Sequence, residues 1–470
     1  MKQRPACVIL VLSIGVVVFL QFWLLISQKV VAPTVLDHRA FSSPQSKVTD
    51  GTTRTNLKEL YDPSKYPVLP GPLPNRAIKV GIVTIHPLAG EAMHFLYDGV
   101  MESEYMELVG IKYLYGLNSN NASPTADIAI APNSLDPSDA QIWIVDASRV
   151  AKLQREFLTR LLSDTTNDTA ATSSWKVLLV DFTDRFQFQL RRYEKLQIWG
   201  SPHVRIAVRS IVQGRHYNTT GASIVKGRLA PNLQTKGGPM LHFPYAVRSD
   251  LVRVLRQESS SIMRTTVTTI TNDPPPASTL DQLQDTLFKM SRPIDVLHLW
   301  QISFKGGGKS KYRNEVSRLV RSWTMTKKWN ASIDEQGERY MTGRNSVDPL
   351  YPRAMMSSKI VIVTQKDDWE DHYRLFEAMV CGSLVIADRM VAPPKGLIHQ
   401  ETIIWFDNLD QLTSLVEFYL QHEEERVKIA QSGWNLAMTH HRSWHRLEEV
   451  LYGMPLTTAA LRPTATKTKL

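Results

Sequence analysis

The sequence predicts an α/β protein in which two Rossmann-like domains face a cleft and are preceded by a transmembrane helix and a stem. Three observations support this prediction. An uncharged apolar run lies near the N-terminus, short apolar runs alternate with stretches that can form helices, and a proline-rich segment divides that alternation in two. With 470 residues, of which 43% are hydrophobic and 21% charged, the composition is that of a folded chain of two or three domains.

Charge and cysteine content exclude several classes of protein. Lys and Arg number 55 and Asp and Glu 45, a net charge of +10, which suits acidic ligands such as phosphates. The chain has no zinc-finger, basic-zipper or RNA-recognition pattern, so nucleic acid is not an expected partner. Two distant cysteines, Cys7 and Cys381, exclude a disulfide-stapled scaffold and a cysteine-based zinc site.

The N-terminus predicts a membrane anchor. Residues 8–26 carry no charge, and their length is close to the ~20 residues that cross a bilayer and exceeds the apolar core of most cleaved signal peptides. Lys2 and Arg4 precede the run, so the positive-inside rule keeps residues 1–7 cytosolic and places the rest in the lumen. The span is short, which favours the Golgi membrane, with the endoplasmic reticulum as second choice.

A stem and several glycosylation signals agree with a lumenal chain. Residues 27–76 are rich in Ser, Thr, Pro and Lys and show little apolar periodicity, which is typical of a spacer. Four sequons predict N-glycosylation in the lumen, at Asn121, Asn167, Asn218 and Asn330.

Two successive alternations of strands and helices follow the stem. Continuous apolar strands between helices indicate a parallel sheet covered on both faces. The first domain is expected over 77–264, a linker with three consecutive prolines over 265–290, the second domain over 291–452 and a tail over 453–470. The expected strands are 77–82, extended towards residue 86, 142–145, 177–180 and 204–208, then 294–299, 360–364, 384–387 and 403–406; the expected helices are 149–162, 311–323, 372–380, 410–421 and 423–439.

The helix expected over 372–380 carries the first candidate ligands. It follows a strand and a polar loop, so its N-terminus would point into the cleft, where backbone N–H groups favour a diphosphate. His372 begins this helix, Arg374 can pair with phosphate, and Glu377 can accept hydrogen bonds from ribose hydroxyls. The alternative is a surface salt bridge between Arg374 and Glu377.

A basic glycine-rich loop, residues 303–313, is the second candidate. Its three glycines let the backbone approach a phosphate, and Lys305, Lys309 and Arg313 supply positive charge. The loop is not a Walker A motif because Ser303 stands where the first glycine is required. The alternative is a flexible basic surface loop.

The first domain offers candidates for catalysis. His86 ends the first strand and could act as a general base on a sugar hydroxyl, and Asp181 and Asp184, after a later strand, are an equal alternative. A structural histidine is the other interpretation of His86. No Asp-x-Asp triplet occurs in the chain, so we expect no metal and no cofactor, with Arg and Lys stabilising the diphosphate instead.

One stretch resembles a known family. Residues 372–388, HYRLFEAMVCGSLVIAD, are similar to the nucleotide-sugar site of group-1 glycosyltransferases, closest to the CgeB/YkvP type, as are the later Phe406-Asp407-Asn408 and His440-His441 followed by Arg442 or Arg446. This resemblance covers roughly residues 350–450 and implies a GT-B fold whose second domain holds the donor. Many retaining members of the wider group have two Glu residues separated by seven others. In this chain Trp369 stands at the position of the first Glu, eight residues before Glu377. The resemblance therefore does not predict whether the enzyme inverts or retains the configuration of the sugar.

Together these features predict a type II membrane glycosyltransferase, a hexosyl- or pentosyltransferase. It would move a sugar from a nucleotide-sugar to a glycan or glycoprotein acceptor, with Lys305, Lys309 and Arg374 stabilising the leaving diphosphate. Two alternatives stay open. A lumenal sulfotransferase shares the topology and the basic loop, and a non-catalytic relative that binds glycans would explain the missing Glu.

Overall fold

The computed structural model describes the two α/β halves of the chain. The residues described are 77–84, 93–113, 136–147, 152–163, 176–182, 203–208, 240–266, 280–300, 310–333, 347–365, 372–390 and 393–453. The expected anchor, residues 8–26, and the stem lie outside these residues, as do Asn121, Asn167 and Asn218. Within the described part of the chain, no helix is long and apolar enough to cross a membrane.

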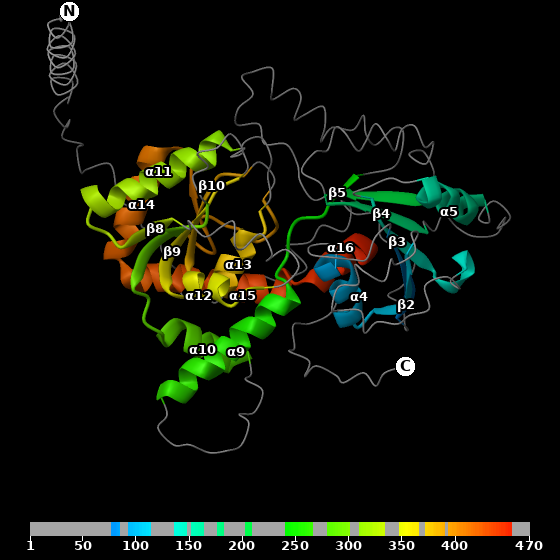
Figure 1. Cartoon of the computed structure of the whole chain (residues 1–470), viewed down its shortest axis with the longest axis horizontal. Coiled ribbons are helices and arrows are strands. Elements are labelled where there is room, and N and C mark those ends of the chain that lie inside the picture. The colour runs from blue at the N-terminus through cyan, green and yellow to red at the C-terminus, as the bar shows by residue number, and fades with distance from the viewer. Residues whose placement is uncertain are drawn as a thin grey trace, which may run out of the picture. The chain divides into compact units, whose positions relative to one another are not determined.

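The first half is built on a sheet of six parallel strands (Figure 1). The strand order is β2-β1-β3-β4-β5-β6. All four strands that the sequence predicts in this half are present, and β2 and β6 were not predicted. The strands are β1 (Ile78–Thr84), β2 (Met106–Tyr113), β3 (Ile142–Asp146), β4 (Val177–Asp181), β5 (Val204–Val208) and β6 (Met240–His242).

Apolar side chains cover both faces of this sheet, as parallel strands require. On one face, Phe157 of helix α5 (Lys152–Ser163) packs edge-on against Trp143 of β3, with ring centroids 5.2 Å apart. Gly81 of β1 is glycine because a Cβ atom there would collide with the Trp143 ring. The other face packs against the helical turns η3 (Met93–Asp98) and α4 (Gly99–Glu102).

The second half has five parallel strands in the order β11-β10-β9-β7-β8. The first strand along the chain, β7, therefore lies between the second and the third, and the direction of winding reverses between β7 and β9. In such sheets, ligands bind outside the carboxyl ends of the strands at this reversal. The strands are β7 (Ile294–His298), β8 (Ala331–Ile333), β9 (Ser358–Val363), β10 (Leu384–Asp388) and β11 (Ile404–Phe406).

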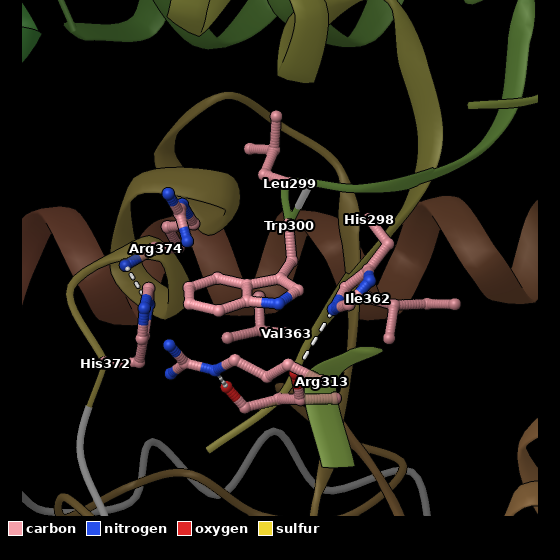
Figure 2. Close-up of a pocket in the computed structure, with 9 residues that line it drawn as sticks. His298, Leu299, Trp300, Arg313, Ile362, Val363, His372 and Arg374 are labelled. Atoms are coloured by element: carbon pink, nitrogen blue, oxygen red, sulfur yellow. Dashed lines mark hydrogen bonds between the residues drawn. The ribbon is translucent and has the colours of Figure 1, made fainter. Parts of the chain in front are cut away.

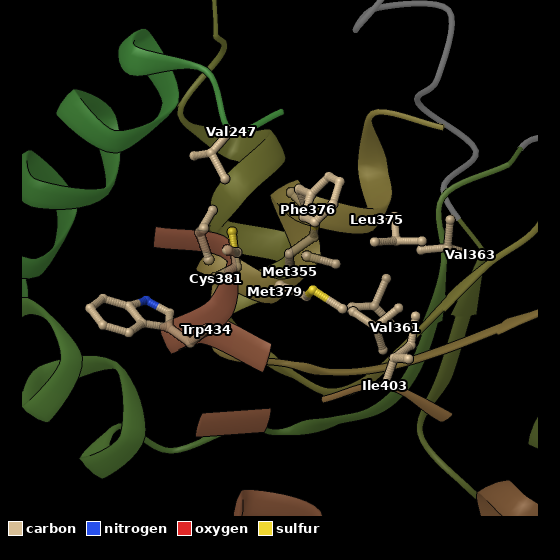
Figure 3. Packing of buried hydrophobic residues seen from close by; sticks show 14 of the residues in the cluster. Val247, Met355, Val361, Val363, Leu375, Phe376, Met379, Cys381, Ile403 and Trp434 are labelled. Carbon is tan, nitrogen blue, oxygen red and sulfur yellow. The ribbon is translucent and has the colours of Figure 1, made fainter. Parts of the chain in front are cut away.

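Helices cover both faces of the second sheet. Two have polar caps: Ser310 Oγ accepts a hydrogen bond from the backbone N–H of Arg313, and Asn408 Oδ1 accepts one from that of Gln411, as expected for N-cap residues. Figure 3 shows the core on the side of α13, where Phe376 and Met379 lie near Val361 of β9. The helices are α11 (Lys311–Thr326), α12 (Leu350–Met356), α13 (Arg374–Val380), α14 (Leu409–Gln421) and α15 (Glu423–His440).

Helix α13 differs slightly from its predicted bounds. It begins at Arg374 rather than His372, and Tyr373, at its N-cap, makes no capping bond through its side chain. The helix ends at Val380, as predicted. Gly382 follows with a φ of 76°, in the left-handed region, and an added Cβ would lie 2.5 Å from Nη2 of Arg292. A glycine is therefore needed there.

The segment between the sheets contains more helix than predicted. The expected linker, 265–290, is too long, because residues 280–289 form helix α10 (Leu280–Lys289). Its Leu283 and Leu287 are fully buried in the core of the second half, as is Leu251 of helix α9 (Ser249–Thr266). The three prolines lie outside the described residues.

The last helix, α16 (Ser443–Tyr452), returns to the first half. Residues 291–452 were expected to form one domain, but Leu447 and Leu451 of α16 pack into the core of the first sheet with Leu96. Arg446 adds polar bonds, because its Nε and Nη2 donate to the carbonyl of Tyr245 at 3.3 and 3.2 Å.

Candidate functional site

A pocket lies at the reversal point of the second sheet, at the carboxyl ends of β7 and β9 (Figure 2). It contains about 190 Å³ of space, open solvent included. Residues from both strand ends and from the starts of α11 and α13 line it, among them His298, Trp300, Arg313, Thr364, His372 and Arg374.

Arg313 is the cation that α11 brings to this pocket. Its side chain is held at two points: Nε donates to the carbonyl of Thr364 at 3.0 Å, and the guanidinium carbon lies 4.7 Å from the centre of the Trp300 ring. The indole is fixed in turn, since its Nε1 donates to Asn314 Oδ1 at 2.9 Å. Arg313 is only 3% exposed, so it is oriented before any ligand binds.

Arg374 is the second cation. Its backbone N–H donates to Nδ1 of His372 at 3.1 Å, and the His372 ring stacks on Tyr373 with centroids 4.6 Å apart. Burial acts to lower the pKa of Arg374, but Tyr373, Tyr351 and Glu377 raise it, and the net shift is upward. Arg374 is therefore always charged. Its Nε is buried and has no hydrogen-bond partner in the described part of the protein.

Glu377 does not line the pocket. It is 1% exposed, and Tyr351 Oη donates a hydrogen bond of 2.5 Å to its Oε2. Burial raises its pKa, against the opposing effects of Arg248, the Tyr351 hydrogen bond and Arg374. The alternative interpretation, a surface salt bridge between Arg374 and Glu377, is wrong because the carboxylate is buried.

Most of the remaining predicted site residues lie outside the described residues: His86, Asp184, Lys305 and Lys309. Asp181 is the last residue of β4. In the first sheet the winding reverses between β1 and β3, so Asp181 lies one strand beyond that point, whereas Asp146, which the sequence analysis did not single out, ends β3 itself.

The other two motifs on which the family resemblance rests, Phe406-Asp407-Asn408 and His440-His441, make structural contacts outside the pocket lining. Asn408 caps α14, and Asp407 Oδ1 accepts a hydrogen bond of 2.7 Å from Arg389, with both side chains half exposed. His441 is fully buried: its Nε2 donates to the carbonyl of Lys395 at 2.9 Å and its Nδ1 accepts from Arg446. Burial, followed by Arg446, moves the pKa of His441 well below its usual value, so the ring is neutral.

Asn330, the fourth predicted glycosylation site, is exposed at the start of the edge strand β8. Its Nδ2 donates to the carbonyl of Pro293 at 2.8 Å. Among the described residues, no three His, Cys, Asp or Glu side chains gather as metal ligands would.

Comparison with known proteins finds a family model that matches part of the chain. Residues 314–452 match the family model described as "Glycosyl transferase-like", from the first turn of α11 to the end of α16. The chain thus carries a glycosyltransferase-like domain, as predicted, whereas the narrower CgeB/YkvP type stays a prediction. No curated protein sequence matches the chain.

Several solved structures are similar in outline. A glycosyltransferase from Rickettsia africae has 11% identity and a TM-score of 0.43, over 79% of this chain and 96% of that one. Sucrose-phosphate synthase from Thermosynechococcus elongatus has 10% identity and a TM-score of 0.38, over 76% and 93%. HepE from Anabaena in complex with UDP-glucose has 11% and 0.36, over 79% and 98%. Similarity at this level says nothing about what this chain binds.

Proposed function

We propose that this protein is a glycosyltransferase that moves a sugar from a nucleotide-sugar donor to a glycan or glycoprotein acceptor. One observation carries the proposal. Two arginines, Arg313 and Arg374, line one pocket at the reversal point of the second sheet, in or directly beside the segment that matches the glycosyltransferase-like family.

The pocket has the chemistry that a departing nucleoside diphosphate needs. When the glycosidic bond to the donor breaks, negative charge develops on the diphosphate, and preorganised cations stabilise that charge best in a site with little water. Arg313 and Arg374 are both charged, and Arg313 is already held in place. Lys305 and Lys309 would add charge from the preceding loop, and His372 a ring nitrogen. No metal enters the proposed mechanism.

The expected role of Glu377 as a ligand of the donor ribose or sugar is not part of this proposal, because its carboxylate is 1% exposed and does not line the pocket. His86 or Asp181 would activate the acceptor hydroxyl as general base, because Asp181 ends β4 and His86 comes two residues after the end of β1.

Nucleotide binding by the full-length chain tests this proposal. Calorimetric titration with UDP and GDP, with EDTA present throughout, should show saturable binding of one of them. Arg313→Ala and Arg374→Ala should each weaken that binding about tenfold or more, because a hydrogen bond to a charged group contributes about 1.5–3 kcal/mol. Arg389→Ala is the matched control, since Arg389 is an exposed arginine that is paired with Asp407 and does not line the pocket.

The outcomes separate the alternatives. Binding of 3′-phosphoadenosine 5′-phosphate alone would replace the proposal with a sulfotransferase. Binding of UDP or GDP without transfer to any acceptor in a glycan screen would favour a non-catalytic relative. A parallel titration without EDTA provides the comparison: binding of UDP or GDP only in the absence of EDTA would contradict the metal-independent mechanism.

We further propose that the chain is a single-pass type II protein of the Golgi membrane. The support is the uncharged run 8–26 behind Lys2 and Arg4. Expressed in mammalian cells, the protein should shift in electrophoresis after glycosidase digestion, because its sequons would lie in the lumen. The combined substitutions Asn121→Gln, Asn167→Gln, Asn218→Gln and Asn330→Gln should abolish the shift. A wild-type chain without glycans would argue for a cytosolic orientation.

A further inference from the structure

His298 occupies the wall of the pocket and joins three elements (Figure 2). It is the last residue of β7 and is 2% exposed. Its Nδ1 lies 2.9 Å from Ser317 Oγ on α11, and its Nε2 lies 3.1 Å from Oγ1 of Thr364, directly after β9. No motif in the sequence drew attention to this histidine.

The hydrogen bonds define the tautomer of His298. Ser317 Oγ donates its one hydrogen to the carbonyl of Trp300 at 2.7 Å, so it can only accept from the imidazole. Nδ1 therefore carries the proton and donates to Ser317. Nε2 has no proton and accepts the hydroxyl hydrogen of Thr364.

The ring is also kept neutral. Burial lowers the pKa of His298 to about 3, and the nearby Arg313 and Arg374 act in the same direction. Because both nitrogens are engaged and the ring does not titrate near neutral pH, His298 is suited neither to general acid–base catalysis nor to binding a metal. Its chemistry is that of a rigid hydrogen-bonded spacer.

The hydrogen bonds of His298 lead to the two residues that hold Arg313 in place, its supports Thr364 and Trp300. Through Ser317, one chain of bonds fixes the backbone of Trp300, whose ring lies along the Arg313 guanidinium. The other bond fixes Thr364, whose carbonyl accepts from Arg313 Nε. A change at His298 would thus loosen both supports together.

We propose that His298 is a positioning residue that orients Arg313 for the donor diphosphate by fixing Thr364 and Trp300 with its two ring nitrogens. The inference rests on the proposed function. It predicts that disturbing the His298 bonds weakens binding of the diphosphate but leaves binding of the nucleoside unchanged, because Arg313 would contact only the phosphates.

The test removes one bond of the network. His298→Ala could fail to fold, whereas Thr364→Val replaces only a hydroxyl by a methyl group of similar size. In the full-length chain, Thr364→Val should weaken binding of UDP or GDP, whichever the wild type binds, about 2- to 10-fold, the usual value of one hydrogen bond. Affinity for uridine or guanosine should stay the same. Thr364→Ser keeps the hydroxyl and should restore most of the lost affinity.

A double-mutant cycle shows whether the effect passes through Arg313. In an Arg313→Ala background, Thr364→Val should cause little further loss, because the group that it positions is gone. An equal loss in both backgrounds, equal losses for nucleoside and diphosphate, or no loss in the single variant would each overturn the inference. Failure of the wild type to bind any nucleoside diphosphate would instead overturn the proposed function itself.

Discussion

At the scale of single residues, the buried carboxylate of Glu377 is subject to opposing effects on its pKa. Burial raises its pKa and Asp250 adds to that effect, whereas Arg248, Arg374 and the hydrogen bond from Tyr351 oppose it. Its pKa is raised, so the folded chain binds its proton more strongly than the unfolded chain does. Stability from this group is therefore present at low pH and falls as pH rises through the window between the ordinary and the raised pKa.

Tyr351→Phe should make this pH dependence steeper. The tyrosine hydroxyl lowers the pKa of Glu377, so its loss raises that pKa further. We expect the variant to lose more unfolding free energy at pH 7.5 than at pH 4.5, because a larger fraction of Glu377 is ionised at the higher pH. A hydrogen bond to the ionised carboxylate contributes roughly 1.5–3 kcal/mol, and one to the protonated carboxyl about 0.5–1.5 kcal/mol. Urea denaturation at both values measures the difference.

A second tyrosine provides the control for that experiment. Tyr452 Oη donates to the neutral carbonyl of Tyr105 at 2.9 Å, so Tyr452→Phe should cost the same at both pH values. If the losses of Tyr351→Phe were also equal at both, the Glu377 carboxylate would not be what Tyr351 stabilises.

At the scale of elements, the sequence predicts the buried strands well and the edges poorly. Central strands such as β3 and β10 are continuous apolar runs because helices cover both of their faces. The edge strand β2, MELVGIKY, interrupts its apolar residues with Glu107 and Lys112, and β8 has only three residues. Neither pattern differs enough from that of a loop to be recognised.

The candidate site was predictable only in part, because some of its residues follow a local sequence pattern and others depend on tertiary structure. Arg313, His372 and Arg374 drew attention as polar residues after apolar strands, and the structure brings them into one pocket. His298 and Thr364 did not, because their role depends on β7 and β9 being neighbours, and strand order is a tertiary property. The burial of Glu377 depends likewise on Tyr351, far from it in the sequence.

At the scale of the whole molecule, α16 ties together parts that the sequence separates. Leu447, Val450 and Leu451 complete the core of the first sheet, although α16 directly follows α15 of the second half. Polar contacts run beside them, since Ser103 Oγ donates to Glu448 at 2.6 Å and Arg442 lies 3.7 Å from Glu102. The first half therefore lacks part of its core until the chain is complete.

A substitution in α16 that removes this apolar contact should destabilise the first half, although α16 lies far from that half in the sequence. Leu451→Ala should lower the unfolding free energy by about 2–5 kcal/mol, as for other buried leucines, and should speed hydrogen exchange in β1 and α4. Val416→Ala is the matched control, because Val416 belongs to the core around α14 and β11 and should speed exchange only there. If Leu451→Ala affected α15 and α16 alone, the first half would hold its core without the last helix, and the two halves would be stable independently of each other.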